Sequence, residues 1–180
     1  MKYLILFFSL LPTWVMALNL SLGESLPNIS IDKVGELQLV DEQISYSPWN
    51  TKQLAGKVRL VQAMAGRSSA KEINAAMIEA IKNANFAAQT YQTTTIVNLD
   101  DAIFGTSMFV QSKLKSNKKK FPHASFVLDK DGQLFDLLDI KPKSSAIILL
   151  DTQGKILFAK DGALNKQEIK QVIKLIYSHI

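Results

Sequence analysis

The sequence predicts an α/β fold with a central mixed sheet, flanking helices and an N-terminal β-hairpin. Between residues 58 and 119, short apolar or β-branched runs alternate with amphipathic helical segments. Such alternation implies parallel strand pairing. A strand–strand–helix pattern then closes the chain and implies an antiparallel edge. The sequence shows no repeat, low-complexity segment or second domain.

The first seventeen residues have the composition of a secretory signal peptide. Lys2 supplies positive charge, an apolar run covers 3–11, and small residues precede a cleavage site after Ala17. The run is short for a bilayer span, which needs about 20 residues, although an uncleaved anchor helix is the alternative. We therefore expect a signal peptide over 1–17, one periplasmic domain over 18–180, and no membrane span after cleavage.

Composition excludes several classes of chemistry. The chain has no cysteine, so it forms no disulfide, thiol nucleophile or zinc–thiolate site. His123 and His179 lie far apart without ligand-like spacing, and we expect no metal and no cofactor. The net charge of +5 is modest. Its densest stretch, Lys113–Lys120, is interpreted as a solvated helix face, with contact to anionic lipid or a polyanion as the alternative. Export and the lack of a binding motif argue against nucleic acid and transcriptional regulation.

The N-terminal third predicts a hairpin followed by a central strand. Residues 36–40 and 44–46 flank a three-residue turn, 41–43. A short turn or helix over 51–55 ends at Gly56. The nearly continuous apolar run 58–64 suits a strand that is buried on both faces.

The middle of the chain predicts helix, strand and helix. Ser69 and Glu72 have the spacing of a capping box. The helix that follows carries an apolar face, made by Ile73, Met77, Ile81 and Ala84. Residues 93–99 are rich in β-branched side chains and predict a strand, and 107–119 predicts a helix.

The last third predicts two hairpins and a helix. Residues 125–129 and 133–136 flank the turn signal Lys130-Asp131-Gly132. A second pair of strands, 146–151 and 155–160, flanks residues 152–154 in the same way. The final helix is expected to begin at Asn165, with Glu168 completing its cap and a buried stripe formed by Ile169, Val172, Ile173 and Ile176.

This element order resembles that of the exported thioredoxin-like proteins of the TlpA and peroxiredoxin-like kind. Gly56-Lys57-Val58 resembles their strand start, and residues 66–71 fall where they carry Cys-x-x-Cys. Here Ser68 and Lys71 occupy the two cysteine positions, and Ser145 stands in place of the cis-proline. Because the thiolate is the nucleophile in thiol–disulfide exchange and in peroxide reduction, both reactions are excluded.

The chain also resembles the YtfJ family of bacterial exported proteins. The similar segments are spread over nearly the whole chain, namely Ala65–Glu72, Tyr91–Asn98, Asp100–Ala102, Met108–Val110, Ser116–Lys119 and Ala159–Leu164. The resemblance implies a periplasmic thioredoxin-like domain. It implies no activity, because the family has none assigned, and it supplies no catalytic residue.

The segment around Arg67 and Lys71 is the first candidate site. Cations in the first turn of a helix oppose its macrodipole, and a bound anion would remove that conflict. Asp100 and Asp101 follow a strand end together with Asn98, where open α/β sheets place ligand sites. Two interpretations stay open for them: they meet the Arg67 loop across the same edge, or they form a turn that caps the next helix.

We therefore expect a non-redox binding or accessory module that uses the vacated Cys-x-x-Cys edge to hold a protein, a peptide or an anionic ligand. The candidate ligand-binding residues are Arg67, Ser68, Ser69, Lys71, Asp100, Asp101 and Ser145. The alternative is a thiol-independent enzyme in which Ser68 or Lys71 reacts. The pair matches the Ser-x-x-Lys of penicillin-interacting enzymes, but the companion Lys-Thr-Gly is missing.

Overall fold

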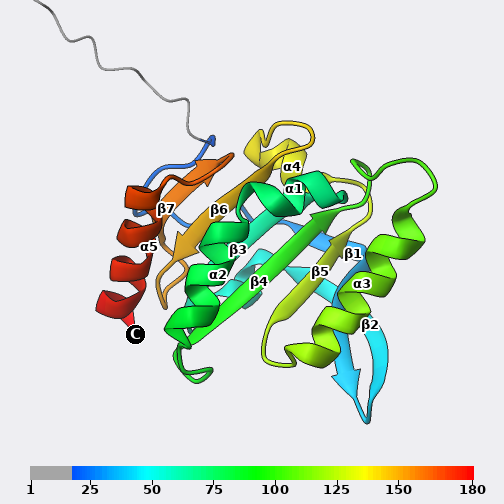
Figure 1. Cartoon of the computed structure of the whole chain (residues 1–180), viewed down its shortest axis with the longest axis horizontal. Coiled ribbons are helices and arrows are strands. Elements are labelled where there is room, and N and C mark those ends of the chain that lie inside the picture. Colours follow the sequence, from blue (N-terminus) through cyan, green and yellow to red (C-terminus); the bar gives the residue numbers. More distant parts are fainter. Residues whose placement is uncertain (1–17) are drawn as a thin grey trace, which may run out of the picture.

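The computed structural model describes residues 18–180, so the predicted signal peptide lies outside the described residues. These residues form a seven-stranded sheet of order β2-β1-β5-β4-β3-β6-β7 (Figure 1). The strands are β1 Ser30–Val40, β2 Gln43–Asn50, β3 Val58–Ala65, β4 Tyr91–Asn98, β5 Ser125–Asp129, β6 Ser145–Leu150 and β7 Ile156–Asp161. The helices are the 3-10 helix η1 Thr51–Leu54 and α1 Ser68–Ile73, α2 Ala75–Ala84, α3 Ser107–Lys120, α4 Gln133–Leu138 and α5 Lys166–His179.

The sheet is mixed, as the sequence predicts. β4 pairs in parallel with both β3 and β5. The remaining pairs are antiparallel: β1 pairs with both β2 and β5, and β6 pairs with both β3 and β7. The predicted N-terminal hairpin is therefore present as β1–β2, and the predicted strand–strand–helix ending is present as β6–β7–α5.

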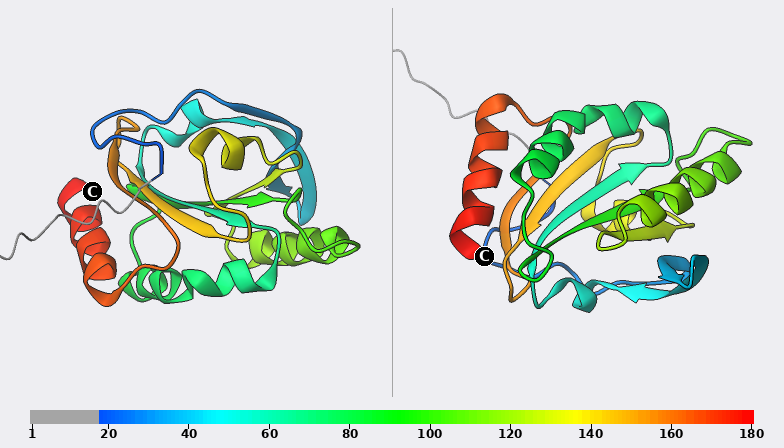
Figure 2. Two further views of the ribbon diagram at one scale, coloured as in Figure 1. Left: turned by 90° about the horizontal axis from the view of Figure 1, so that it is seen from above. Right: turned by 60° about the horizontal axis from the view of Figure 1, so that its bottom comes forward.

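The sheet lies between two layers, which are visible in the left view of Figure 2. On one face, α2 and α5 bury an apolar cluster against β3 and β6 that includes Leu60, Met77, Val172 and Ile176. α3 closes a smaller cluster on β4 and β5. The N-terminal segment, η1 and α4 cover the other face. The sheet is thus buried on both sides, which is why its central strands are almost continuously apolar.

The prediction of a strand over 133–136 is wrong, because these residues belong to α4. β5 already pairs with β1 on one side and β4 on the other, so no edge is left for a hairpin partner. Gly132 turns the chain with a φ of 70°, and the Asp129 carboxylate accepts the Leu134 amide at 2.9 Å. Residues of α4 then pack into the apolar cluster on the face of the sheet opposite α2 and α5.

The predicted capping box at Ser69 and Glu72 is also wrong. The helix begins at Ser68, and Arg67 occupies the N-cap position without a side-chain cap bond. The helix then breaks at Asn74, so the expected single helix is two, α1 and α2. Asn74 is buried and donates its side-chain amide to the carbonyls of Ser145, at 2.8 Å, and Gly162, at 3.2 Å. These bonds to the first residue of β6 and to the residue after β7 hold Asn74 in place between α1 and α2.

Candidate functional site

The ends of the parallel strands define one edge of the sheet, which we call the carboxyl edge. β3, β4 and β5 end there at Ala65, Asn98 and Asp129, which lie side by side in register. The antiparallel β6 begins at the same edge with Ser145. The loops that follow β3 and β4 and the loop that precedes β6 therefore meet here (Figure 1).

Arg67 and Asp101 form the central contact of this edge. The Arg67 guanidinium donates through Nε to the Asp101 carbonyl at 2.9 Å and through Nη2 to Asp101 Oδ1 at 2.5 Å. Each side chain is only 16% exposed. The other carboxylate oxygen of Asp101 accepts the Lys143 amide. Asp101 thus joins the loops after β3, after β4 and before β6. Its carboxylate is the negative partner for which the sequence had suggested a bound anion at Arg67.

Asn98 shapes the turn that presents Asp101. Its Oδ1 accepts the amides of Asp100, at 2.8 Å, and Asp101, at 3.3 Å. Its carbonyl accepts the Gly66 amide at 2.8 Å. Asp101 therefore meets the Arg67 loop across the edge, and the exposed Asp100 lies beside it in the same turn. They do not cap α3, which starts after Thr106 without a side-chain cap bond.

A second carboxylate holds the loop before β6 from its other side. Asp161, at the end of β7, accepts the Lys141 amide at 3.1 Å and the Ser144 hydroxyl at 2.5 Å. With Asp101 on Lys143, residues 141–144 are bonded on both flanks. The described residues, this loop included, contain no cis peptide bond.

Ser145 does not reach the surface. It is fully buried, and its hydroxyl accepts from Gln62 Nε2 at 3.3 Å and from Asn74 Nδ2 at 3.2 Å. The expectation that Ser145 faces a ligand across the edge is therefore corrected: in this structure it bonds β3 and the α1–α2 junction to the start of β6.

Ser68, Ser69, Lys71 and Asp100 are the candidate residues that are exposed. The two serines and Lys71 lie together on the short helix α1, directly after the Arg67 contact. Among residues 18–180, no hydrogen bond joins Ser68 to Lys71, and no group of three His, Asp or Glu side chains is placed to hold a metal. Nucleophilic chemistry at Ser68 requires a base within reach of its hydroxyl.

Asp129 is the buried titratable group beneath this edge. It is fully buried, one carboxylate oxygen accepts the Leu134 amide, and Oδ1 has no partner within the described part of the chain. Burial raises the pKa of Asp129, and the Leu134 amide with the neighbouring backbone amides of residues 131–133 partly opposes the shift. No local pattern indicates this burial, because Asp129 stands where an ordinary strand ends before a turn.

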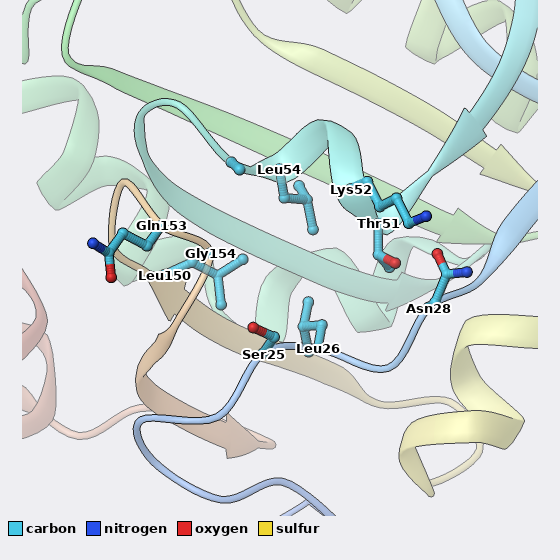
Figure 3. Close-up of a pocket in the computed structure, with 10 residues that line it drawn as sticks. Ser25, Leu26, Asn28, Thr51, Lys52, Leu54, Leu150, Gln153 and Gly154 are labelled. Atoms are coloured by element: carbon cyan, nitrogen blue, oxygen red, sulfur yellow. The ribbon is translucent and has the colours of Figure 1, made fainter.

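A shallow hollow of about 490 Å³ lies beside the carboxyl edge, between β1 and the β4–α3 loop. It is lined by Val34, Leu99, Asp100, Ala102, Ile103, Phe104, Gly105, Ser107, Gln111 and Lys130. A second hollow, of about 350 Å³, lies near the start of β3, at the opposite end of the sheet (Figure 3). Leu26 and Leu54 point toward one another across it, and Lys52 is its one charged lining residue. It brings no reactive groups together.

The fold and the Cys-x-x-Cys position together define a thioredoxin-like protein without thiols. The thioredoxin domain of a thiol–disulfide oxidoreductase from Bacteroides vulgatus superposes with a TM-score of 0.54 at 16% identity, covering 87% of this chain and 99% of that one. At such identity the likeness establishes the fold alone. In the described part of the chain, no helix has the length and apolar character to cross a bilayer.

The chain belongs to the family described as "Bacterial protein of unknown function (YtfJ_HI0045)", which matches residues 20–179. It is 48% identical over 175 residues to "Uncharacterized protein YtfJ" of Escherichia coli (strain K12), covering 97% of this chain and 95% of that protein. It is 44% identical over 164 residues to an uncharacterized protein of Haemophilus influenzae, covering 91% and 88% of the two chains. The predicted family is therefore confirmed.

Proposed function

We propose that this protein is an exported, periplasmic binding module that holds a protein or peptide partner at the carboxyl edge and carries out no redox chemistry. The observation that carries the proposal is the exposure of Ser68, Ser69 and Lys71 on α1, at the positions where thioredoxin-like enzymes place their reactive segment. The full sequence contains no cysteine to react there.

The contacts behind α1 support a recognition role. The Arg67–Asp101 pair and the Lys143 amide fix the base of the helix, so the exposed side chains are presented from a rigid support. Pre-organised groups lose less entropy when a partner binds. Because Arg67 is already paired, the argument for an anionic ligand at this residue falls away, and a protein or peptide is the better match.

A photocrosslinking amino acid at Ser69 tests this function. We expect one discrete adduct from a bacterial periplasmic extract, and we expect Lys71→Glu to abolish it because that change reverses a charge next to the probe. The same probe at exposed Lys170 on α5 is the control for nonspecific capture, and Lys174→Glu is the charge-matched control. Equal capture at both positions, or an adduct indifferent to Lys71→Glu, would contradict the proposal.

The enzyme alternative has its own test. A phosphonate probe that labels Ser68 in the native chain and not in Lys71→Ala would establish a Ser–Lys nucleophile in place of a recognition site. We expect no labelling, since both side chains are exposed and unbonded to one another among the described residues.

A further inference from the structure

Four large apolar side chains are exposed within seven residues at the junction of the β4–α3 loop and α3. Ile103, Phe104, Met108 and Phe109 are each more than half exposed. The other exposed apolar side chains of the described chain are scattered. Soluble proteins rarely leave such a contiguous patch in water unless it contacts something. We call these four residues the apolar tip; Figure 1 shows the loop that carries it projecting beyond the sheet.

The outer face of α3 continues from the apolar tip into a run of lysines. At helical spacing, Met108 is followed by Ser112, Lys115 and Lys119, and Phe109 by Lys113, Ser116 and Lys120. These eight positions are all exposed. From Phe109 to Lys120 the helix rises by roughly 17 Å. One exposed surface therefore carries apolar groups at one end and cations along the rest.

The charge on this surface has one sign. The sequence of α3 contains no aspartate or glutamate. Two acidic side chains adjoin it: Asp100 lies at the base of the loop, and Glu42 lies 3.9 Å from Lys119 at an exposed position. Lys118 faces inward and donates to the carbonyls of Pro122 and Ala124, at 3.0 and 2.9 Å, so it belongs to the fold.

We propose that the apolar tip and the α3 lysines form a docking surface for an anionic phospholipid bilayer. Apolar side chains enter the headgroup–acyl boundary, and lysines bind lipid phosphates, so membrane-surface segments combine the two. Met108 and Phe109 line neither hollow, and Ile103 and Phe104, which border the shallow hollow beside the carboxyl edge, are still more than half exposed. Such exposure suits insertion into a fluid layer. This inference does not depend on the proposed function. If both hold, docking in this way places the carboxyl edge, with α1, close to the bilayer surface.

Vesicle flotation tests the proposal, using residues 18–180, which hold every described strand, helix and core cluster. We expect binding to vesicles in which about a third of the lipid is phosphatidylglycerol, little binding to phosphatidylcholine alone, and weakening as salt rises. Phe104→Ser with Phe109→Ser should weaken binding about a hundredfold, or about tenfold for each ring. Leu22→Ser with Leu137→Ser, at exposed sites elsewhere, should not change it.

Two triple variants with the same net charge separate the contribution of the α3 lysines from that of net charge. Replacing Lys113, Lys119 and Lys120 by Gln should reduce binding by about tenfold or more, because each lysine near an anionic surface contributes severalfold. Replacing the exposed α5 residues Lys166, Lys170 and Lys174 by Gln makes the same change in net charge and should have little effect. Equal losses in the two triples would overturn the proposal, since they would indicate attraction by net charge alone.

A fluorescent reporter confirms insertion. Phe104→Trp places a tryptophan on the tip. Because Trp49 is only 2% exposed and Trp14 is outside the purified segment, the introduced tryptophan is the one whose emission should change when vesicles are added. Its emission should shift to the blue with anionic vesicles. Absence of vesicle binding by the native chain, with a protein crosslinked at Phe109 instead, would overturn the proposal in favour of a protein partner. The uncharged photocrosslinking probe at Ser69 should leave vesicle binding intact, so failure of the partner site and failure of docking are distinguishable.

Discussion

The two longest helices, α5 and α3, have the same length of 14 residues and opposite designs. α5 begins with a complete capping box, in which Asn165 accepts the amides of Gln167 and Glu168 and Glu168 accepts the Asn165 amide. α3 begins after Thr106 without any side-chain cap. α5 buries Val172 and Ile176 in the core, whereas the first turn of α3 leaves Met108 and Phe109 exposed.

The means of attachment differ as well. The apolar stripe of α5 holds it to the sheet, whereas α3 buries Leu114 together with the charged Lys118. Burial lowers the pKa of Lys118, and nearby Glu36 partly opposes that shift. Among the described residues, Val34, beside the hollow, is the one β-branched residue with a positive φ, of 75°, and Asp129 keeps one oxygen without a partner. We infer that the α5 side is held mainly by apolar packing, whereas the α3 side leaves apolar and charged groups exposed.

The largest expected difference in stability is between truncation of a buried apolar residue on α5 and truncation of an exposed one on α3. Ile176→Ala should lower the free energy of unfolding by about 2–5 kcal/mol, because it leaves a cavity in a fully buried site. Phe109→Ala should change it by no more than about 0.5 kcal/mol, since the ring is mostly exposed. Urea denaturation of both variants measures this. Comparable losses would show that α3 packs as tightly as α5.

Breaking the Arg67–Asp101 contact is expected to have the next largest effect. Asp101→Ala removes an ion pair and an acceptor for the Lys143 amide, and should cost about 1–3 kcal/mol. Amide exchange should rise in residues 99–102 and 141–144 while α5 stays protected. Asp100→Ala, at the exposed neighbour, is the control and should be near neutral. Uniformly faster exchange would instead place the contact in the global core.

Removing the α5 cap should have a smaller effect. Asn165→Ala deletes the acceptor of two backbone amides and should cost about 1 kcal/mol in unfolding free energy. Thr106→Ala at the start of α3 deletes no cap bond and should cost less. Thermal unfolding of the pair measures the difference. A larger loss for Thr106→Ala would remove the contrast between the two helix starts.

The smallest effect is a pH-dependent gain in stability from Asp129→Asn. Because burial raises the pKa of Asp129 in the folded state, its contribution to stability is present below about pH 3.9, the ordinary Asp pKa, and is lost as pH rises through the folded pKa. Asparagine stays neutral, so the variant should be more stable than the native chain at pH 7 and gain nothing near pH 3. Asp32→Asn, at an exposed position, is the control. A gain independent of pH would contradict burial as the cause.

The sequence predicted those elements whose signals are local. The apolar run 58–64, the β-branched run 93–99 and the Asn165 cap each announce an element without reference to distant residues, and all three elements are present. The strand expected over 133–136 failed because its fate depends on β1 and β4, which pair with β5 on both sides.

The same limit applied at the site. Sequence pattern brought Asp100, Asp101 and the Arg67 loop to one edge, because strand order fixes where strands end. It did not pair Arg67 with Asp101, which is 34 residues away, and it did not bury Ser145 under Asn74. One feature of the sequence could have indicated the exposed tip. Four large apolar residues, Ile103, Phe104, Met108 and Phe109, lie close together at the start of α3, whereas the buried positions of that helix are Leu114 and Lys118.

The central claim is that the α3 side presents contact groups and the α5 side stabilises the fold. Hydrogen exchange with and without anionic vesicles tests it most directly. We predict slow exchange throughout α5 in both conditions, fast exchange in residues 103–109 of the free protein, and protection of 103–109 when vesicles are added. Protection that appears along α5 instead, or a tip already as protected as α5 in the free protein, would contradict the account.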